Sequence, residues 1–358
     1  MAGLRQTTAR LASHRRQWQE SISPAPDANG GSAARSSRKL VEIEDLGANP
    51  GALRMLVYLP DHLPAGAPLV VALHGCNQTA EAFDAGAGWS ALAERFGFAL
   101  LLPEQRTCNN ANGCFNWFLP GDARRGRGEA GSIRNMVERL VVDKELDRER
   151  IFIAGFSAGG AMTSVLLATD PEIFAAGAII AGLPFGGATN VRHAFDSMVQ
   201  GKSRPGREWA YYVRRASTHK GPWPRLSVWH GSADSTVQPM NAGEIIKQWT
   251  EVHGLTLYPT EASTSRGRQH RVWRGPDGTP LLESHSIPGM GHAVPVASGD
   301  TPRFYGGTGP FAADVGISSS FEIASFWGLT EAPQDVLASN SQTTPAAAKL
   351  RRTLPFGS

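Results

Sequence analysis

Cysteine is scarce in this chain of 358 residues, and long apolar runs are missing. The three cysteines are too few for the disulfide-dense scaffold of a small secreted domain, and one is left over if two of them pair. No Cys or His repeats around them at zinc-like spacing, so we expect no metal site and no cofactor. The longest apolar run, at 175–183, is broken by glycine. It falls far short of the roughly 18 residues that a membrane span needs.

A large excess of charge of one sign is also missing. The formal net charge is +3; seven basic and two acidic side chains give the first 40 residues +5, which leaves −2 for the rest. A basic tail on a nearly neutral body gives no electrostatic footprint for nucleic acid. Arginine interrupts every apolar cluster before Trp18, so no Sec signal peptide is visible. A cytoplasmic location is therefore the default expectation.

Composition divides the chain into three parts. Residues 1–38 and 330–358 are rich in small and polar residues and in proline, and we predict that both segments are disordered. The composition changes at Lys39. The chain as a whole contains 41% hydrophobic residues, which is enough to bury a sizeable core. We expect one large catalytic domain over residues 39–329, without internal repeats.

Short apolar runs alternate with helical periods through residues 39–329. Strands are predicted at 53–59, 69–73, 98–102, 151–154, 176–181 and 226–229, and a hairpin at 271–274 and 281–287. Helices are predicted at 80–96, 133–146, 158–169, 192–199, 241–253 and 321–329. Asn241, with Glu244 three residues later, is expected to cap the helix at 241–253. The alternation favours an α/β fold with a mostly parallel sheet and helices on both faces.

The segment Gly155-Phe156-Ser157-Ala158-Gly159 stands between a predicted strand and a predicted helix. It has the Gly-x-Ser-x-Gly pattern of a nucleophile elbow, which reverses a strand into a helix within one residue. Glycines beside the serine leave room for the strained backbone that such a turn requires. We therefore predict that Ser157 is a catalytic nucleophile; the alternative is a serine packed in a tight turn.

A serine hydroxyl needs a base to take its proton, and the base needs a carboxylate to hold its tautomer. Asp234 follows the strand that ends at Trp229, and His292 follows the strand that ends at Ile287. This gives the order Ser, Asp, His that belongs to a nucleophile elbow. The alternative carboxylates are Asp300 and Glu283. Two other histidines that precede a glycine at a strand end, His74 and His230, are expected to shape loops.

A tetrahedral oxyanion needs preorganised N–H donors. By position, the N–H groups of Ala158, next to the serine, and of Cys76, after an earlier strand, are predicted to form the oxyanion hole. Aromatic side chains on loops at the same edge of the sheet are expected to reach a substrate groove, with core packing as the alternative. They are Trp117, Phe118, Phe185 and Trp223, of which Trp117 and Trp223 are the preferred contacts.

Five ordered motifs over residues 39–329 together resemble one family. They are Leu73-His74-Gly75-Cys76-Asn77-Gln78, Gly113-Cys114-Phe115-Asn116-Trp117-Phe118, Gly155-Phe156-Ser157-Ala158-Gly159-Gly160, Trp229-His230-Gly231-Ser232-Ala233-Asp234 and Gly289-Met290-Gly291-His292. The combination is similar to the esterase family of the poly(3-hydroxybutyrate) depolymerases, which also includes feruloyl and acetylxylan esterases. That resemblance implies the α/β-hydrolase fold.

The resemblance also implies roles for particular residues. Ser157, Asp234 and His292 would form the triad, and Cys76 would line the oxyanion hole. Cys76 and Cys114 occupy positions that look like a family disulfide pair, which leaves Cys108 over. Many relatives are secreted.

We therefore expect a metal-free serine carboxylesterase that acts through an acyl-enzyme on short hydroxyalkanoate esters or oligomers. One alternative is a feruloyl or acetylxylan esterase with the same triad, and another is acyl transfer to an alcohol rather than water. An alternative of a different class is a non-catalytic protein of the same fold that binds a polyester granule or a partner. The expected partner is a small ester, oligoester or polyester, with no nucleic acid and no membrane span, and the oligomeric state stays open.

Overall fold

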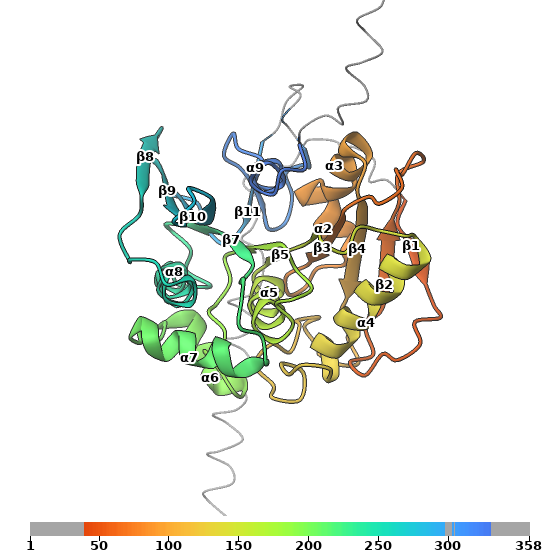
Figure 1. Cartoon of the computed structure of the whole chain (residues 1–358), viewed down its shortest axis with the longest axis horizontal. Coiled ribbons are helices and arrows are strands. Elements are labelled where there is room, and N and C mark those ends of the chain that lie inside the picture. The colour runs from red at the N-terminus through yellow and green to blue at the C-terminus, as the bar shows by residue number, and fades with distance from the viewer. Residues whose placement is uncertain (1–38, 298–302, 304, 331–358) are drawn as a thin grey trace, which may run out of the picture.

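The computed structural model of the chain describes residues 39–297, 303 and 305–330 (Figure 1). The two ends of the chain, 1–38 and 331–358, lie outside the described residues, so their expected disorder stays a prediction. Within the described part, no helix has both the length and the apolar character that crossing a membrane requires.

A ten-stranded sheet forms the centre of the described part, in the order β1-β2-β4-β3-β5-β6-β7-β10-β9-β8 (Figure 1). Its strands are β1 (Val41–Ile43), β2 (Arg54–Tyr58), β3 (Leu69–Leu73), β4 (Ala99–Glu104), β5 (Ile151–Phe156), β6 (Ala176–Ile180), β7 (Arg225–Gly231), β8 (Glu261–Ser265), β9 (Arg268–Arg274) and β10 (Pro280–Ile287). The strands from β4 to β10 in this order are parallel, and antiparallel strands flank them at both edges. The predicted mostly parallel sheet is confirmed.

Helices cover both faces of this sheet. One face packs against α4 (Gly128–Asp143), α5 (Ala158–Thr169), α6 (Val191–Val199), α7 (Gly206–Ala216) and α8 (Met240–His253). The other face packs against α2 (Ala80–Ala87), α3 (Trp89–Phe96) and α9 (Ser319–Phe326). Every residue of β3, β5 and β6 is buried, because parallel strands between two helical layers meet water on neither side. A small parallel pair, β11 (Val294–Val296) and β12 (Ala312–Asp314), stands apart from the main sheet.

The single helix predicted at 80–96 is two helices. Gly88, with φ of 77°, ends α2 and precedes α3, and its N–H donates to the carbonyl of Asp84. The Asp84 carboxylate accepts from both the backbone N–H and the hydroxyl of Ser90, which fixes the start of α3. A Cβ at position 88 would overlap the backbone of Gly306. The helical period continues across this break, so the apolar pattern alone did not reveal it.

The predicted cap of the helix at 241–253 is wrong. α8 begins at Met240 with Pro239 at its N-cap. Asn241 instead donates to the carbonyls of Ser197 and Gln238, and Glu244 accepts from the indole N–H of Trp209. Both side chains thus bind neighbouring segments rather than the first turn of their own helix.

Candidate active site

The turn between β5 and α5 holds Ser157 in a strained backbone conformation, with φ of 56° and ψ of −116°. Its N–H donates to the carbonyl of Ile180 at 2.9 Å, which anchors the turn to the neighbouring strand β6. A Cβ at Gly155 would overlap the carbonyl oxygen of Gly159, and a Cβ at Gly159 would overlap that of Leu73. The two glycines of the elbow are therefore required by close backbone approach, as the sequence predicts.

His292 lies on the loop that leaves β10, and its ring reaches the serine across the sheet edge. Its Nε2 atom is 2.8 Å from the Ser157 hydroxyl. The ring of Phe156, which precedes the serine, packs against the His292 ring with centroids 4.9 Å apart. A neutral imidazole whose Nε2 lone pair faces the hydroxyl is arranged to take the serine proton.

Asp234 lies on the loop after β7 and is buried at 2% exposure. One carboxylate oxygen is 2.7 Å from Nδ1 of His292, and the other accepts from the N–H groups of Thr236 and Val237 at 2.9 Å each. The first contact favours the tautomer with the proton on Nδ1, which leaves Nε2 free to accept from the serine. The second contact fixes the carboxylate within its own turn.

His230, expected only to shape a loop, also contacts the Asp234 carboxylate. Its Nε2 atom lies 2.8 Å from the carbonyl of Val237 and 3.2 Å from Oδ2 of Asp234. Burial alone would raise the pKa of Asp234, but hydrogen bonds from His230 and His292 outweigh it and hold that pKa well below its ordinary value. The carboxylate thus stays charged inside the protein. Sequence reasoning missed this second histidine; the only available signal was its position four residues before the aspartate.

The turn after β3 lies beside the elbow, because the parallel register pairs Leu73 with Gly155. This turn carries Cys76, which forms a disulfide with Cys114 on the loop after β4. The turn is further fixed by a bond from the Gly75 N–H to the Gln78 side chain at 2.8 Å. Cys108 is exposed and free.

Ala158 is the first residue of α5 and is buried beside Ser157. The N–H groups of a first helical turn have no partner within the helix and carry partial positive charge. Ala158 directly follows Ser157, and Cys76 lies on the turn after the neighbouring strand β3. Their role as oxyanion donors remains a prediction.

A buried carboxylate holds the loop between the disulfide and the predicted aromatic contacts. Glu129, at 1% exposure, accepts from the backbone and side-chain N–H groups of Asn116, each at 2.7 Å, and from the amide of Gln105. Burial raises the pKa of Glu129 to about 7, against the opposing effect of these donors. No sequence signal indicated this residue.

The aromatic residues predicted to bind substrate separate into two groups. Trp117 and Phe118, in edge-to-face contact at 5.4 Å, line a cavity of about 670 Å³ together with Phe185. Trp223 does not line this cavity, and its ring packs against His219 with centroids 5.0 Å apart. All four contacts with substrate remain predictions, although the cavity brings the first three residues together.

Of the two alternative carboxylates, Asp300 lies outside the described residues. Glu283 accepts from the Ser227 hydroxyl at 2.6 Å and lies 3.1 Å from Nε2 of His270. Within the described part of the chain, Glu283, His270 and His285 form the one group whose ligand atoms are close enough to hold a metal ion, within 4.8 Å. However, the two imidazoles stack nearly parallel, 11° apart with centroids separated by 4.2 Å, so no single ion lies in both ring planes. Glu283 is hydrogen-bonded to His270, and the His285 ring is stacked between the rings of His270 and Trp229.

Comparison with known proteins agrees with this geometry. A family model described as "Esterase PHB depolymerase" matches residues 53–277. The chain is 43% identical over 291 residues to the poly(3-hydroxyalkanoate) depolymerase C of Paucimonas lemoignei, a match that covers 81% of this chain and 70% of that protein.

Less similar relatives are named as acetylxylan or feruloyl esterases. The feruloyl esterase B of Talaromyces funiculosus is 30% identical over 265 residues, which cover 72% of this chain and 74% of the relative. Among solved structures, the acetyl xylan esterase from Aspergillus awamori superposes with a TM-score of 0.70 at 25% identity, over 82% of this chain and 100% of that one. The α/β-hydrolase fold expected from the sequence is thereby confirmed.

Proposed function

This chain belongs to the esterase family of the poly(3-hydroxybutyrate) depolymerases, and from that premise we propose that it hydrolyses hydroxyalkanoate esters through an acyl-enzyme on Ser157. Its family and its relatives make it an ester hydrolase. The observation that carries the proposed mechanism is the continuous chain of contacts from Ser157 through His292 to Asp234, at 2.8 and 2.7 Å.

Acylation begins when the Ser157 oxygen attacks the ester carbonyl. The serine proton passes to Nε2 of His292, a new bond joins Oγ to the carbonyl carbon, and the carbonyl electrons move onto oxygen. The N–H groups of Cys76 and Ala158 are the donors we assign to that oxyanion. When the tetrahedral intermediate collapses, the bond to the alcohol oxygen breaks, and His292 returns the proton to the departing alcohol.

Deacylation repeats these steps with water as the nucleophile. His292 takes a proton from the water, the hydroxyl adds to the acyl carbon, and the Ser157 oxygen leaves with the proton that His292 gives back. Asp234 holds the imidazolium through its Nδ1–H in both halves of the reaction and keeps its own charge. The hydrogen bonds that lower the pKa of Asp234 support this role.

Hydroxyalkanoate esters or oligomers are the substrates we favour. The relative named as a poly(3-hydroxyalkanoate) depolymerase is 43% identical, whereas the acetylxylan and feruloyl esterases compared are 30–33% identical. The feruloyl or acetylxylan alternative keeps the same triad and differs only in the acyl group and the alcohol.

The decisive experiment compares hydrolysis of soluble (R)-3-hydroxybutyrate trimer, methyl ferulate and p-nitrophenyl acetate by the wild type and by Ser157→Ala. We expect fast trimer cleavage that falls by several orders of magnitude in the variant, because a lost nucleophile removes most of the catalysis. Retention of more than about a hundredth of wild-type turnover would refute the role of Ser157. A clear preference for methyl ferulate would shift the function to the plant-polysaccharide alternative. Failure of a fluorophosphonate to label Ser157 would favour the non-catalytic alternative.

A further inference from the structure

A cavity of about 670 Å³ lies beside the end of α5, and its wall combines aromatic rings with guanidinium groups. The aromatic residues are Trp117, Phe118, Phe185, Tyr211 and Tyr212, and the basic residues are Arg124, Arg125, Arg127 and Arg215. No aspartate or glutamate is among the described residues that line it. Its volume falls in the range of ordinary ligand sites. The cavity therefore matches a ligand that has both an apolar body and a negative charge.

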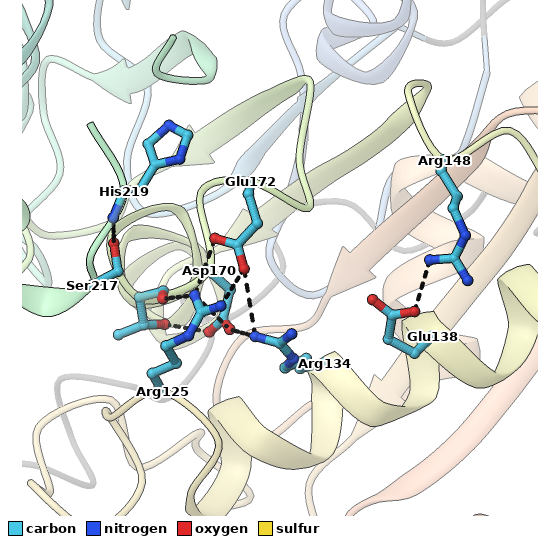
Figure 2. A network of polar contacts seen from close by, with 9 residues as sticks. Arg125, Arg134, Glu138, Arg148, Asp170, Glu172, Ser217 and His219 are labelled. Carbon is cyan, nitrogen blue, oxygen red and sulfur yellow. Dashed lines mark hydrogen bonds and ion pairs between the residues drawn. The ribbon is translucent and has the colours of Figure 1, made fainter. Parts of the chain in front are cut away.

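The charge of one of these arginines is already balanced. Arg125 forms ion pairs with Glu172 and, at 3.4 Å, with Asp170, and it also donates to the carbonyl of Thr169 at 2.7 Å (Figure 2). Figure 2 shows Arg134 on the other side of the same two carboxylates, and its guanidinium lies 2.5 Å from Asp170. This network ties the loop that carries Arg125 to the end of α5.

The neighbouring arginines keep their charge available to a ligand. Arg124 and Arg127 flank Arg125 on the tied loop, are exposed, and form no ion pair with any residue that the structure describes. Arg215 lies across the cavity on α7, where it stacks on the ring of Tyr211 and donates to its hydroxyl. Guanidinium groups bind carboxylates through paired hydrogen bonds, so these positions suit a carboxylate.

The distance to the proposed nucleophile sets the length of such a ligand. Thr169, which lines the cavity, is twelve residues after Ser157 on α5, so it lies roughly 18 Å from the serine along the helix. An extended peptide spans about 3.5 Å per residue, which has three backbone bonds. A 3-hydroxyalkanoate unit has four bonds along its chain, so one extended unit spans about 4.7 Å. Because α5 is buried along its whole length, a chain that reaches from the serine to the cavity passes around the helix and has at least about four units.

A polyester chain has a direction, so its terminal carboxylate always lies on the alcohol side of the ester bond that is cleaved. When the serine is acylated, the fragment that leaves as an alcohol carries the free carboxylate at its other end. We propose that the cavity between the 117–127 loop and α7 binds the carboxylate-terminated end of a hydroxyalkanoate oligomer, with Arg124, Arg127 and Arg215 as its anion-binding residues. This proposal rests on the proposed function and adds to it recognition of the acid end of the chain.

The test measures binding of (R)-3-hydroxybutyrate pentamer to Ser157→Ala protein, with the ligand either as the free acid or as its methyl ester. The readout is the ratio of the two dissociation constants. We expect the acid to bind about tenfold more tightly than the methyl ester at low salt, which is the effect of one charge-assisted hydrogen bond. Adding Arg124→Gln and Arg127→Gln is expected to bring the ratio close to one. Arg215→Gln alone is expected to lower it by a smaller factor.

The matched control removes two exposed arginines elsewhere, through Arg148→Gln and Arg150→Gln. Arg148 pairs with Glu138, and neither residue lines the cavity (Figure 2). Because the control has the same net charge as the test variant, it is expected to keep the acid preference. Equal dissociation constants for the two ligands would overturn the proposal, as would an equal loss of preference in the control.

Hydrolysis of the same pentamer by the wild type separates this proposal from the proposed function. If the wild type does not cleave the pentamer although the inactive protein still prefers the acid, the proposed function fails and the anion site stands. If the wild type cleaves the acid and the methyl ester rapidly with equal kcat/KM, and the inactive protein binds both equally, the proposed function stands and the proposed anion site is refuted.

Discussion

The two oxygens of Asp234 have separate partners, and this division explains how a buried carboxylate can orient a histidine. Oδ1 binds the backbone of its own turn, while Oδ2 faces His292 and His230. The sequence predicted the aspartate because its place after β7 follows from the order of the strands. It did not predict His230, because a histidine before a glycine is typical of many turns and nothing local indicates which way the ring points.

At the same scale, Glu129 is expected to make stability depend on pH. In the folded protein the pKa of Glu129 is about 7, whereas the ordinary pKa of a glutamate is 4.5. The protonated carboxyl therefore favours the folded state fully below pH 4.5, and this contribution of about 3 kcal/mol is lost as the pH rises to 7. Glu129→Gln has no such proton. The difference between the free energies of unfolding of the variant and the wild type should therefore shift by about 3 kcal/mol in favour of the variant from pH 4 to pH 8.

Urea denaturation at a series of pH values measures this difference. Glu138→Gln, at a partly exposed position of the same helix α4, is the matched control. The role given to Glu129 is wrong if both variants follow the same pH trend relative to the wild type.

Among the elements, the loop from Glu104 to Gly128 depends most on a covalent link. The Cys76–Cys114 disulfide joins this loop to the turn after β3, across 38 residues of chain. Closing a loop of that length in the unfolded chain is worth about 4 kcal/mol in the entropic account. Replacing both cysteines by alanine is expected to lower the free energy of unfolding by about that amount. It is also expected to reduce kcat/KM, because the turn that positions the backbone N–H of Cys76, an assigned oxyanion donor, loses its covalent link.

Chemical denaturation and ester hydrolysis of the double variant test both effects. Cys108→Ala, which removes the exposed free thiol, should change neither. An unaltered kcat/KM in a folded double variant would show that the turn after β3 keeps its shape without the disulfide.

Sequence reasoning found the elements that contain continuous apolar runs and missed several short or largely polar elements. The buried strands from β3 to β7 were predicted within a few residues, because continuous apolar runs indicate strands with helices on both sides. β8 was missed, since all five of its residues are exposed and polar or small. α7 was also missed, although its buried residues Trp209, Ala210 and Val213 recur at helical spacing, because charged and aromatic residues fill most of the segment 206–216. The buried side of α7 packs against α8.

At the scale of the whole molecule, the described part forms a sheet between two helical layers, with a hydrophobic cluster on each face. The triad residues come from loops after β5, β7 and β10, so the shared edge of the parallel strands brings them together. This geometry was predictable because strand order determines the edge. The arginine cavity was not, because it depends on how the 117–127 loop folds back onto the end of α5.

A trimmed chain of residues 39–330 tests whether one domain contains all of this. We propose that the trimmed chain folds alone, because the described residues by themselves supply the ten-stranded sheet and a hydrophobic cluster on each of its faces. Its kcat/KM on soluble esters is expected to stay within about twofold of the full chain, and its melting temperature within a few degrees. Loss of folding would show that a terminal segment belongs to the core.

The strained backbone at Ser157 has a consequence for how this fold tolerates heat. A residue other than glycine held in such a conformation costs about 1–3 kcal/mol, and the surrounding close contacts keep it there. Ser157→Gly is therefore expected to melt at a higher temperature than Ser157→Ala, although both lack the hydroxyl, and calorimetry of the two variants measures the difference. Catalytic competence and thermal endurance are opposed at this position. Selection for thermal stability alone would favour a glycine at position 157, and the enzyme would then lose its activity.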